Sequence, residues 1–272
     1  MGYTTKIDWC NSTWNPVTGC LHGCEYCYAR GIAHRYGGYN IDPVCESTLI
    51  GTRPDGTKIV VLEHQLSRID KNDVVRPATY PYEFTPTLHR YRLDQPSKWS
   101  EPRTIFVCSM ADLFGEWVPD DWIEQVLKAC DNAAQHRFLF LTKNTSRYKD
   151  LMNLLPAHRH PNNTAEMWFD QSYTGIGEYR IMPLPLVHNT FVSVEPLLHG
   201  LSEKDMTAIA MTNDWIIIGA ETGNRRGKVI PDKSWVDGIA RHAKERNVPV
   251  FMKESLREIM GDCFRQEFPW EE

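Results

Sequence analysis

The sequence predicts an α/β fold, a partial or complete parallel β/α barrel of the TIM-like kind with six or seven units and an inserted lobe after the first helix. From residue 104 onward, apolar runs of strand length end in polar residues and are followed by helix-length amphipathic segments. Continuous apolar strands that alternate with helices are typical of a parallel sheet buried on both faces. Such barrels often use a length of 272 residues as one unit, so we expect residues 1–272 to form a single domain.

The first unit of this fold is predicted from the amino-terminal residues. Residues 3–19 indicate a short strand and a loop, and a loop with three cysteines follows. The run Tyr28–Tyr36 has helical character and is followed by Gly37 and Gly38, a pair typical of a helix end. The cysteine loop is therefore expected between a strand and a helix.

Residues 38–103 are predicted to form the inserted lobe. Prolines recur in this segment and break any long helix. The turn sequence Arg53–Thr57 precedes an apolar run, which predicts a hairpin turn entering a strand. Aromatic and basic residues interleave between Tyr80 and Arg92, a pattern that can bind a nucleotide, although packing of the lobe against the main body is the more usual explanation.

The remaining strands and helices follow in alternation. Five apolar runs predict strands, at 104–109, 137–143, 190–195, 214–221 and 248–254. A weaker run, 167–170, falls between the second and the third. Amphipathic spacing predicts helices over 119–134, 145–154 and 232–246.

Composition limits the classes of function. Hydrophobic residues make up 42% of the chain, and no apolar run reaches the length of a membrane span, so no membrane partner is expected. A net charge of −5 argues against a broad basic surface for non-specific nucleic-acid binding. The local cluster Arg225, Arg226 and Lys228 is compatible with a phosphate-bearing substrate, although a solvated loop is the slightly favoured interpretation. The chain opens without an apolar signal segment, which predicts a cytoplasmic protein.

Three thiols, Cys20, Cys24 and Cys27, fall within eight residues at C-x3-C-x2-C spacing. A loop this short can wrap three sulfurs around one metal centre, and it leaves a four-ligand site one ligand short. A four-iron cluster held by three thiolates keeps one iron open, and that iron can bind a substrate or cofactor. The residue before the last cysteine is aromatic, Tyr26.

Other interpretations of the cysteines stay open. With His22 or His34, the three thiols can form a Cys3His zinc site, although the sequence has no second C-x2-C pair of the kind usual in structural zinc sites. Disulfides are disfavoured by the expected reducing compartment. The other cysteines are scattered singly and are interpreted as small buried apolar residues, namely Cys10, Cys45, Cys108, Cys130 and Cys263.

Chemistry in β/α barrels gathers at the carboxyl ends of the strands. Polar residues end the predicted strands there, namely Ser109, Asp112, Thr142, Lys143, Ser193, Glu195, Glu221, Thr222, Lys253 and Glu254. Taken singly, each is as consistent with a solvent-facing loop. Together they would bring two lysines and two glutamates to one mouth, at positions 143, 195, 221 and 253.

The cysteine loop, read as C-x3-C-x-aromatic-C, resembles the cluster loop of the radical SAM (S-adenosylmethionine) superfamily, and the match is complete. The resemblance implies that Cys20, Cys24 and Cys27 hold a [4Fe-4S] cluster whose open iron binds S-adenosylmethionine. In that superfamily an electron from the cluster cleaves the cofactor to methionine and a 5′-deoxyadenosyl radical. It also implies an electron donor such as flavodoxin or ferredoxin.

A cofactor pocket at the barrel mouth follows from the same resemblance. S-adenosylmethionine is zwitterionic and carries a sulfonium, so its pocket needs a lining of mixed charge. The segment Gly219–Gly223 resembles the glycine-containing strand ends that approach the adenosine in these barrels. The residues expected to contact the cofactor are Tyr26, Ser109, Lys143, Ser193, Glu195, Gly219, Glu221 and Lys253.

Further motifs extend the resemblance over most of the chain except residues 38–103. Trp-Asn-Pro-Val-Thr-Gly-Cys, Ser-Met-Ala-Asp-Leu-Phe, Leu-Thr-Lys, Val-Glu-Pro-Leu and Gly-Ala-Glu-Thr-Gly are similar to a phage and bacterial radical SAM-like group of unassigned activity. The first hypothesis is therefore a radical SAM enzyme that acts on a nucleobase or nucleic acid, as phage-associated modification suggests. The second is a zinc-stabilised nucleic-acid-binding protein without catalysis.

Overall fold

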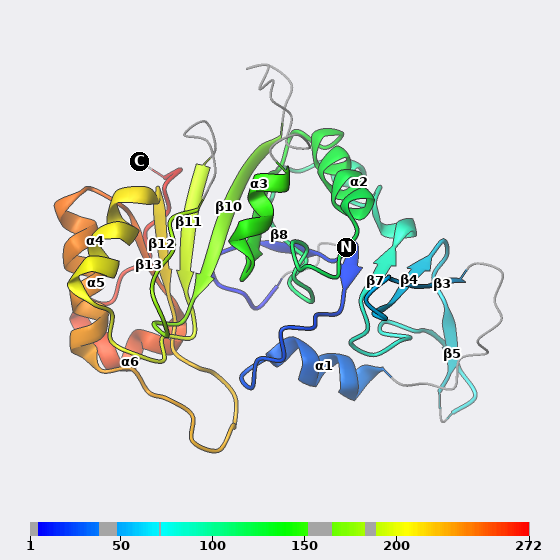
Figure 1. The fold of residues 1–272 in the computed structure, drawn as a ribbon, viewed down its shortest axis with the longest axis horizontal. Helices are drawn as coiled ribbons and strands as arrows, with labels where there is room; N and C mark the ends of the chain where they lie inside the picture. The colour runs from blue at the N-terminus through cyan, green and yellow to red at the C-terminus, as the bar shows by residue number, and fades with distance from the viewer. Residues whose placement is uncertain (1–4, 38–47, 71, 152–164, 183–188, 272) are drawn as a thin grey trace.

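The computed structural model describes residues 5–37, 48–70, 72–151, 165–182 and 189–271. Its main feature is a curled sheet of seven parallel strands in the order β1-β8-β9-β10-β11-β12-β13, as Figure 1 shows. The strands are β1 (Ser12–Trp14), β8 (Thr104–Val107), β9 (Arg137–Thr142), β10 (Glu166–Tyr173), β11 (Asn189–Val194), β12 (Trp215–Ile218) and β13 (Val250–Met252). The prediction of a partial β/α barrel is confirmed.

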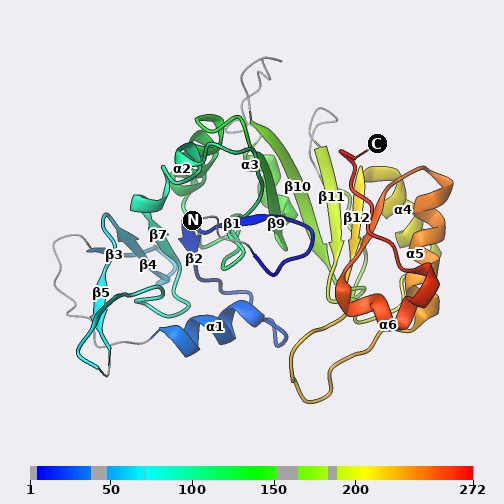
Figure 2. The same cartoon turned by 180° about the vertical axis from the view of Figure 1, so that it is seen from behind.

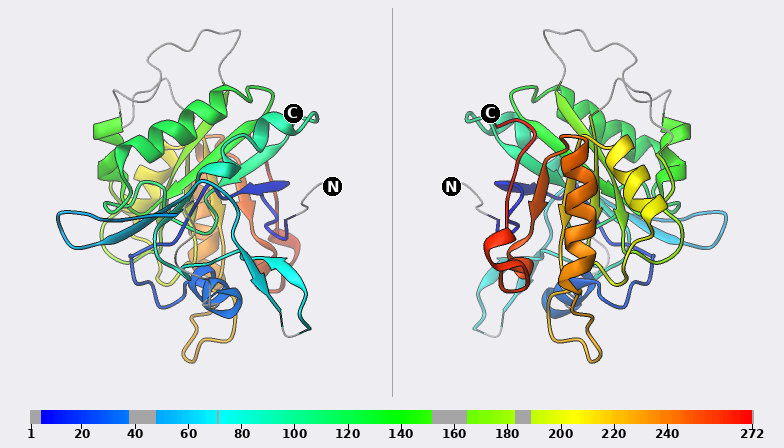
Figure 3. Two further views of the ribbon diagram at one scale, coloured as in Figure 1. Left: turned by 90° about the vertical axis from the view of Figure 1, so that its right-hand side faces the viewer. Right: turned by 90° about the vertical axis from the view of Figure 1, so that its left-hand side faces the viewer.

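Helices cover the outer, convex face of this sheet. They are α2 (Asp120–Asp131), α3 (Tyr148–Leu151), α4 (Glu203–Thr212) and α5 (Lys233–Glu245), and a short helix α6 (Arg257–Met260) follows β13. Figure 3 shows α4 and α5 side by side on this face. No helix in the described part of the chain is long and apolar enough to cross a bilayer.

Alternate residues of each strand face opposite layers, and both layers are apolar. In β8, Ile105 and Val107 pack toward the helices, whereas Phe106 faces the concave side. The concave side is filled by an aromatic layer that includes Trp9, Trp168 and Trp215. This double burial explains why the strands are continuous apolar runs in the sequence.

The first unit has the predicted order of strand, cysteine loop and helix. After β1, the two-residue strand β2 (Val17–Thr18) leads into the loop, and α1 (Tyr28–Tyr36) follows it. The Cys27 sulfur accepts a hydrogen bond from Arg30 N at 3.4 Å and so caps the start of α1. A Cβ at Gly37 would lie 2.4 Å from Ala33 O, which explains why a glycine ends the helix.

The lobe strands lie to one side of the main sheet, as Figure 2 shows. They form a four-stranded sheet, β2-β7-β4-β3, and a two-stranded ribbon, β5-β6. Their bounds are β3 (Thr48–Thr52), β4 (Lys58–Leu62), β5 (Ser67–Ile69), β6 (Val75–Pro77) and β7 (Thr87–His89). The predicted hairpin turn is present between β3 and β4, with Gly56 N donating to Arg53 O at 2.9 Å.

The limits of the lobe, and the single domain over 1–272, stay predictions. Residues 38–47, which include Cys45, lie outside the described residues. Since β2 belongs to the lobe sheet, the lobe is tied to the segment that enters the cysteine loop.

Two elements differ from expectation. The run 167–170 was interpreted as the weakest strand, yet β10 has eight residues and is the longest strand in the described part of the chain. Its second half carries Asp170, Gln171 and Ser172, which hide the apolar pattern. Helix α4 was not predicted, although Ser202 caps it by accepting a hydrogen bond from Asp205 N at 3.1 Å.

Candidate functional site

A cavity of about 200 Å³ lies at the carboxyl ends of the strands, between the cysteine loop and the sheet. We call it the thiol cavity. Of the predicted site residues, it is lined by Cys20, Cys24, Tyr26, Cys27, Ser109, Lys143, Ser193, Glu195, Glu221 and Lys253. Trp9 and Phe106 of the aromatic layer also line it. The structure thus brings these residues together, while their roles as ligands stay predictions.

Among the residues expected to contact the cofactor, Gly219 is the one that does not line the thiol cavity, and the strand-end candidate Glu254 also lies outside it. Gly219 sits at the end of β12. It lies behind the ion pair of Glu195 and Lys253, which joins the ends of β11 and β13. A Cβ at Gly219 would lie 2.9 Å from Lys253 Cδ and 3.1 Å from Glu195 Cδ. The glycine therefore lets the ion pair approach the backbone of the neighbouring strand.

The cysteine loop begins at a position that requires glycine. Gly19 has a φ of +90°, and a Cβ there would lie 2.4 Å from Thr85 O. Its N–H donates to Met110 O at 2.9 Å. The loop is thereby held between the lobe and the segment that follows β8.

The three thiols suit a soft metal centre. Burial, together with the smaller effects of nearby Asp112, Cys27 and Cys24, raises the pKa of the Cys20 thiol to about 12. Thiolates in such a place need a compensating cation, and a bound metal supplies one. The described residues hold no group of three or more His, Cys, Asp or Glu side chains already arranged to hold a metal ion.

The other described cysteines do not line the thiol cavity, namely Cys10, Cys108, Cys130 and Cys263. Cys108 and Cys130 are buried, as predicted, and Cys10 is half-buried, whereas Cys263 is exposed, so the packing interpretation is wrong for Cys263. The described cysteines that line the cavity are therefore the three of the loop, and three thiolates fit a cluster with one open iron.

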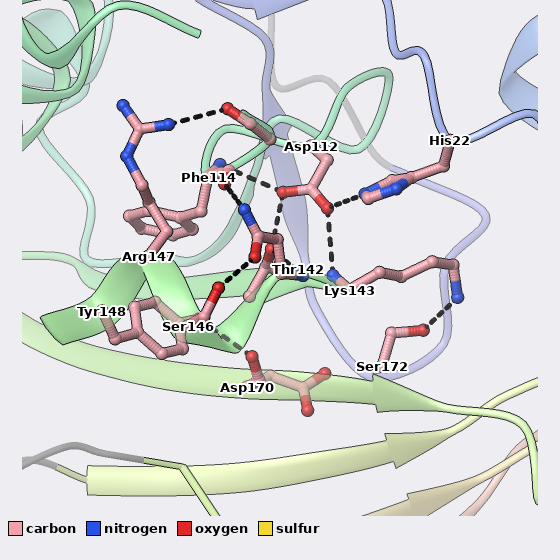
Figure 4. Close-up of polar contacts among 12 residues, drawn as sticks. His22, Asp112, Phe114, Thr142, Lys143, Ser146, Arg147, Tyr148, Asp170 and Ser172 are labelled. Carbon is pink, nitrogen blue, oxygen red and sulfur yellow. Dashed lines mark hydrogen bonds and ion pairs between the residues drawn. The ribbon is translucent and has the colours of Figure 1, made fainter. Parts of the chain in front are cut away.

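Asp112 joins the cysteine loop to the end of β9 (Figure 4). Its Oδ2 accepts hydrogen bonds from His22 Nε2 at 2.6 Å and Lys143 N at 3.0 Å. Its Oδ1 accepts from Thr142 Oγ1 at 2.7 Å and Phe114 N at 3.0 Å. The sequence indicates Asp112 only as a strand-end residue. No local pattern predicts the four hydrogen bonds that it accepts.

Lys143 extends from the end of β9 across the mouth. Its Nζ donates to Ser172 Oγ at 2.7 Å, at the end of β10, as Figure 4 shows. The same nitrogen lies 5.5 Å from the centroid of the Tyr26 ring in the cysteine loop. Ser172 was not predicted as a site residue because its strand was underestimated.

Glu221 holds the loop of residues 221–229, which follows β12 at the mouth. Its carboxylate accepts from Arg225 Nε at 2.5 Å and Nη2 at 2.7 Å, and Arg225 also pairs with Glu25 of the cysteine loop at 3.7 Å. The Arg225 hydrogen bonds lower the pKa of Glu221 below its ordinary value. Arg225 is therefore engaged within the protein, while Arg226 and Lys228 belong to the exposed part of the loop.

Residues 4–258 match the family described as "Protein of unknown function (DUF5131)". The chain belongs to the DUF5131 family. No curated protein matches it. The family match covers the whole curled sheet and the cysteine loop described above, so both features lie inside the family region.

Two solved structures of spore photoproduct lyase share the fold of this DUF5131 chain. The lyase complexed with dinucleoside spore photoproduct has a TM-score of 0.51 and 12% identity, over 92% of this chain and 80% of the lyase chain. A mutant lyase with dinucleoside spore photoproduct also has a TM-score of 0.51 and 12% identity, over 93% and 79% of the two chains. At this identity the likeness concerns the fold.

Asp170 is a buried carboxyl of β10 beneath the mouth. Its Oδ1 accepts from Ser193 N at 2.8 Å, and its Oδ2 has no hydrogen-bond partner among the described residues. Burial raises the pKa of the Asp170 carboxyl well above its ordinary value, although the Ser193 hydrogen bond and the charge of Lys143 act in the opposite direction. The folded chain thus favours the neutral acid at this position.

Replacing Asp170 with asparagine should flatten the pH dependence of stability. Above pH 3.8, the ordinary pKa, the unfolded chain releases the proton that the folded chain retains, so the free energy of unfolding falls as pH rises. Urea unfolding should be measured at about pH 5 and about pH 8. The free energy of unfolding of Asp170→Asn, relative to that of the unmodified chain, should be higher at the higher pH. Asp237→Asn, at an exposed site, is the control, and equal pH slopes for Asp170→Asn and the unmodified chain would contradict the assignment.

Proposed function

We propose that this DUF5131 chain is a radical S-adenosylmethionine enzyme whose substrate is a nucleobase or nucleic acid. The observation that carries the proposal is the placement of Cys20, Cys24 and Cys27 in one cavity with charged strand ends, at the carboxyl edge of a curled parallel sheet. The fold neighbours support the superfamily, because spore photoproduct lyase is a radical SAM enzyme. The lyase complexes contain a dinucleoside ligand, which supports the substrate class.

The three thiolates would hold the [4Fe-4S] cluster, which supplies the electron that cleaves the cofactor when both are bound. The chain's own side chains would then bind and orient S-adenosylmethionine. Lys253 and Glu195 offer opposite charges for the carboxylate and ammonium ends of the methionyl group. The Tyr26 ring offers a face for the adenine.

The cavity floor excludes water from this region. Trp9 is 2% exposed and Phe106 is 6% exposed, and both line the thiol cavity. A dry, apolar floor strengthens the electrostatic contacts above it and protects reactive species from side reactions. The polar groups at the strand ends and the aromatic layer below them thus serve different parts of one site.

The alternative is a zinc site without catalysis, and one observation favours keeping it. His22 lines the thiol cavity and can supply a fourth ligand beside the three cysteines. His34 does not line the cavity, and it pairs with Glu83 at 3.0 Å instead. His34 is therefore excluded as the fourth ligand of the zinc.

Metal and cofactor analysis of the anaerobically purified chain tests the proposal. We expect about four iron and four sulfide per chain, with visible absorbance. Calorimetry should then show binding of S-adenosylmethionine, and a chemical reductant, flavodoxin or ferredoxin should start its cleavage. Stoichiometric zinc without cofactor binding would support the alternative and exclude the radical enzyme.

A further inference from the structure

A second cavity of about 560 Å³ adjoins the thiol cavity. We call it the cationic cavity. Tyr26, Lys143 and Ser172 line both cavities, so one layer of side chains separates them. The rest of its wall comes from the segment after β9 and the loop after β10. Its volume lies within the range of small-ligand sites in proteins.

Positive charge is concentrated on this wall, in a chain whose net charge is −5. Lys143, Lys149 and Arg180 line the cavity, and Lys149 and Arg180 make no ion pair within the described ranges. Among the described residues that line the cavity, the one acid is Glu178, which pairs with Lys204 at 3.5 Å. A hollow lined by one sign of charge concentrates ligands of the other sign, so the cavity favours an anion.

Neutral hydrogen-bonding groups accompany the cations. Asn144, Thr145 and Ser146 line the cavity next to Lys143. Asn144 is held in place, because its Nδ2 donates to Phe114 O at 3.1 Å and its Oδ1 accepts from Ser146 Oγ at 2.6 Å. Hydroxyl, amide and cationic donors are the groups that bind phosphate oxygens in nucleic-acid complexes.

A buried amide without a partner is a second, independent sign of a ligand. Gln171 lines the cationic cavity and is 8% exposed. Its Oε1 is buried and has no hydrogen-bond partner in the described part of the chain. A primary amide offers one acceptor and two donors, which match the edge of a nucleobase. Buried polar groups are normally satisfied, so the empty acceptor indicates a ligand group.

The loop after β10 forms a fixed wall. Gly175 has a φ of +80°, and a Cβ there would lie 2.4 Å from His199 O. Tyr173 donates to Gly177 O at 2.7 Å, which fastens the loop to its own strand. Ile176 and Ile181 line the cavity and are each 62% exposed, so the wall also offers apolar surface.

We propose that the cationic cavity binds a phosphate-bearing nucleotide unit of the substrate. Lys149 and Arg180 bind the phosphate, and Gln171 contacts the base. This inference rests on the proposed function, which requires a substrate beside the thiol cavity. It adds the place where the substrate binds and the residues that recognise it.

Binding measurements on the full-length chain, purified anaerobically, test the inference. The probes are a fluorescein-labelled single-stranded oligonucleotide and an unlabelled nucleoside monophosphate as competitor. We expect Lys149→Ala and Arg180→Ala each to weaken oligonucleotide binding about tenfold and to lower the salt slope of log K by about one. Lys244→Ala removes an exposed lysine of α5 on the outer face and is the matched control, with no change in either quantity.

Gln171→Leu separates recognition of the base from attraction of the phosphate. The substitution removes the amide and leaves the charge of the cavity unchanged. The affinity for the oligonucleotide should therefore fall, while the slope of log K against salt stays the same. Competition by the monophosphate would indicate that the ligand is a free nucleotide. Binding of the oligonucleotide without such competition would indicate a nucleic-acid strand. Both results support nucleotide binding in the cationic cavity. Variants that bind as the unmodified chain does, or an unmodified chain that binds neither probe, would overturn it.

Failure of this inference and failure of the proposed function give different results. A chain that keeps iron and cleaves S-adenosylmethionine but binds neither probe would overturn the cationic cavity alone. A chain that contains zinc and binds the oligonucleotide through Lys149 and Arg180 would keep the cavity and overturn the radical enzyme.

Discussion

Replacing Cys20, Cys24 and Cys27 together with alanine is expected to remove bound iron, visible absorbance and cleavage of S-adenosylmethionine, while the fold is retained. The three thiols line a cavity at the strand ends, two large apolar clusters of the sheet and helices contain none of them, and Cys20 only packs against the edge of a third. A small zinc module, by contrast, generally fails to fold without its metal. Circular dichroism and a cooperative thermal transition should therefore survive the triple substitution.

Two single substitutions control for the loss of a thiol as such. Cys263→Ala removes an exposed thiol, and Cys10→Ala removes a half-buried one whose pKa is raised to about 12 by burial. Both should retain the full iron content. Loss of iron from either variant would reveal a fourth protein ligand, and the open iron on which the radical enzyme depends would then be closed.

Asp112→Ala should be the most damaging single substitution at the mouth. It would leave the Thr142 hydroxyl, the His22 ring and two backbone N–H groups without their acceptor. Removing one partner of a buried charged network costs about 3–5 kcal/mol of unfolding free energy. Because His22 lies between two of the cysteines, iron content after reconstitution should fall as well.

Urea unfolding and iron analysis measure both effects. Asp112→Asn keeps one acceptor oxygen and should lie between alanine and the unmodified chain. Asp237→Ala breaks an exposed pair with Lys233, and such pairs contribute at most about 1 kcal/mol. If Asp112→Ala were no more destabilising than Asp237→Ala, the network would not hold the loop.

Much of the sheet can be predicted from the sequence because a parallel strand buried on both faces is a continuous apolar run. β9 and β12 are apolar on both faces, and both were predicted. β10 was underestimated because Asp170 and Gln171 replace apolar residues near the mouth. The polar residues that obscured the strand are the ones that serve the candidate sites.

The site was predictable only in part, for a physical reason. The strand-end rule places Lys143, Glu195 and Lys253 at one edge because parallel strands end together. Pairs such as His22 with Asp112 join segments far apart in the chain, and no local pattern encodes them. α4 was missed because exposed Met211 lies beside buried Ala210, which blurs its periodicity.

The aromatic layer beneath the mouth has an optical consequence. Trp9 lines the thiol cavity, and its ring centroid lies 6.5 Å from that of Trp215. Trp168 lies 6.4 Å from Trp215, so the indoles form a continuous chain through the floor. Excitation energy passes readily between rings this close, and a coloured metal cluster quenches indole emission. The aromatic floor therefore also gives the chain an intrinsic fluorescence signal, by which loading of the proposed cluster can be timed without a label.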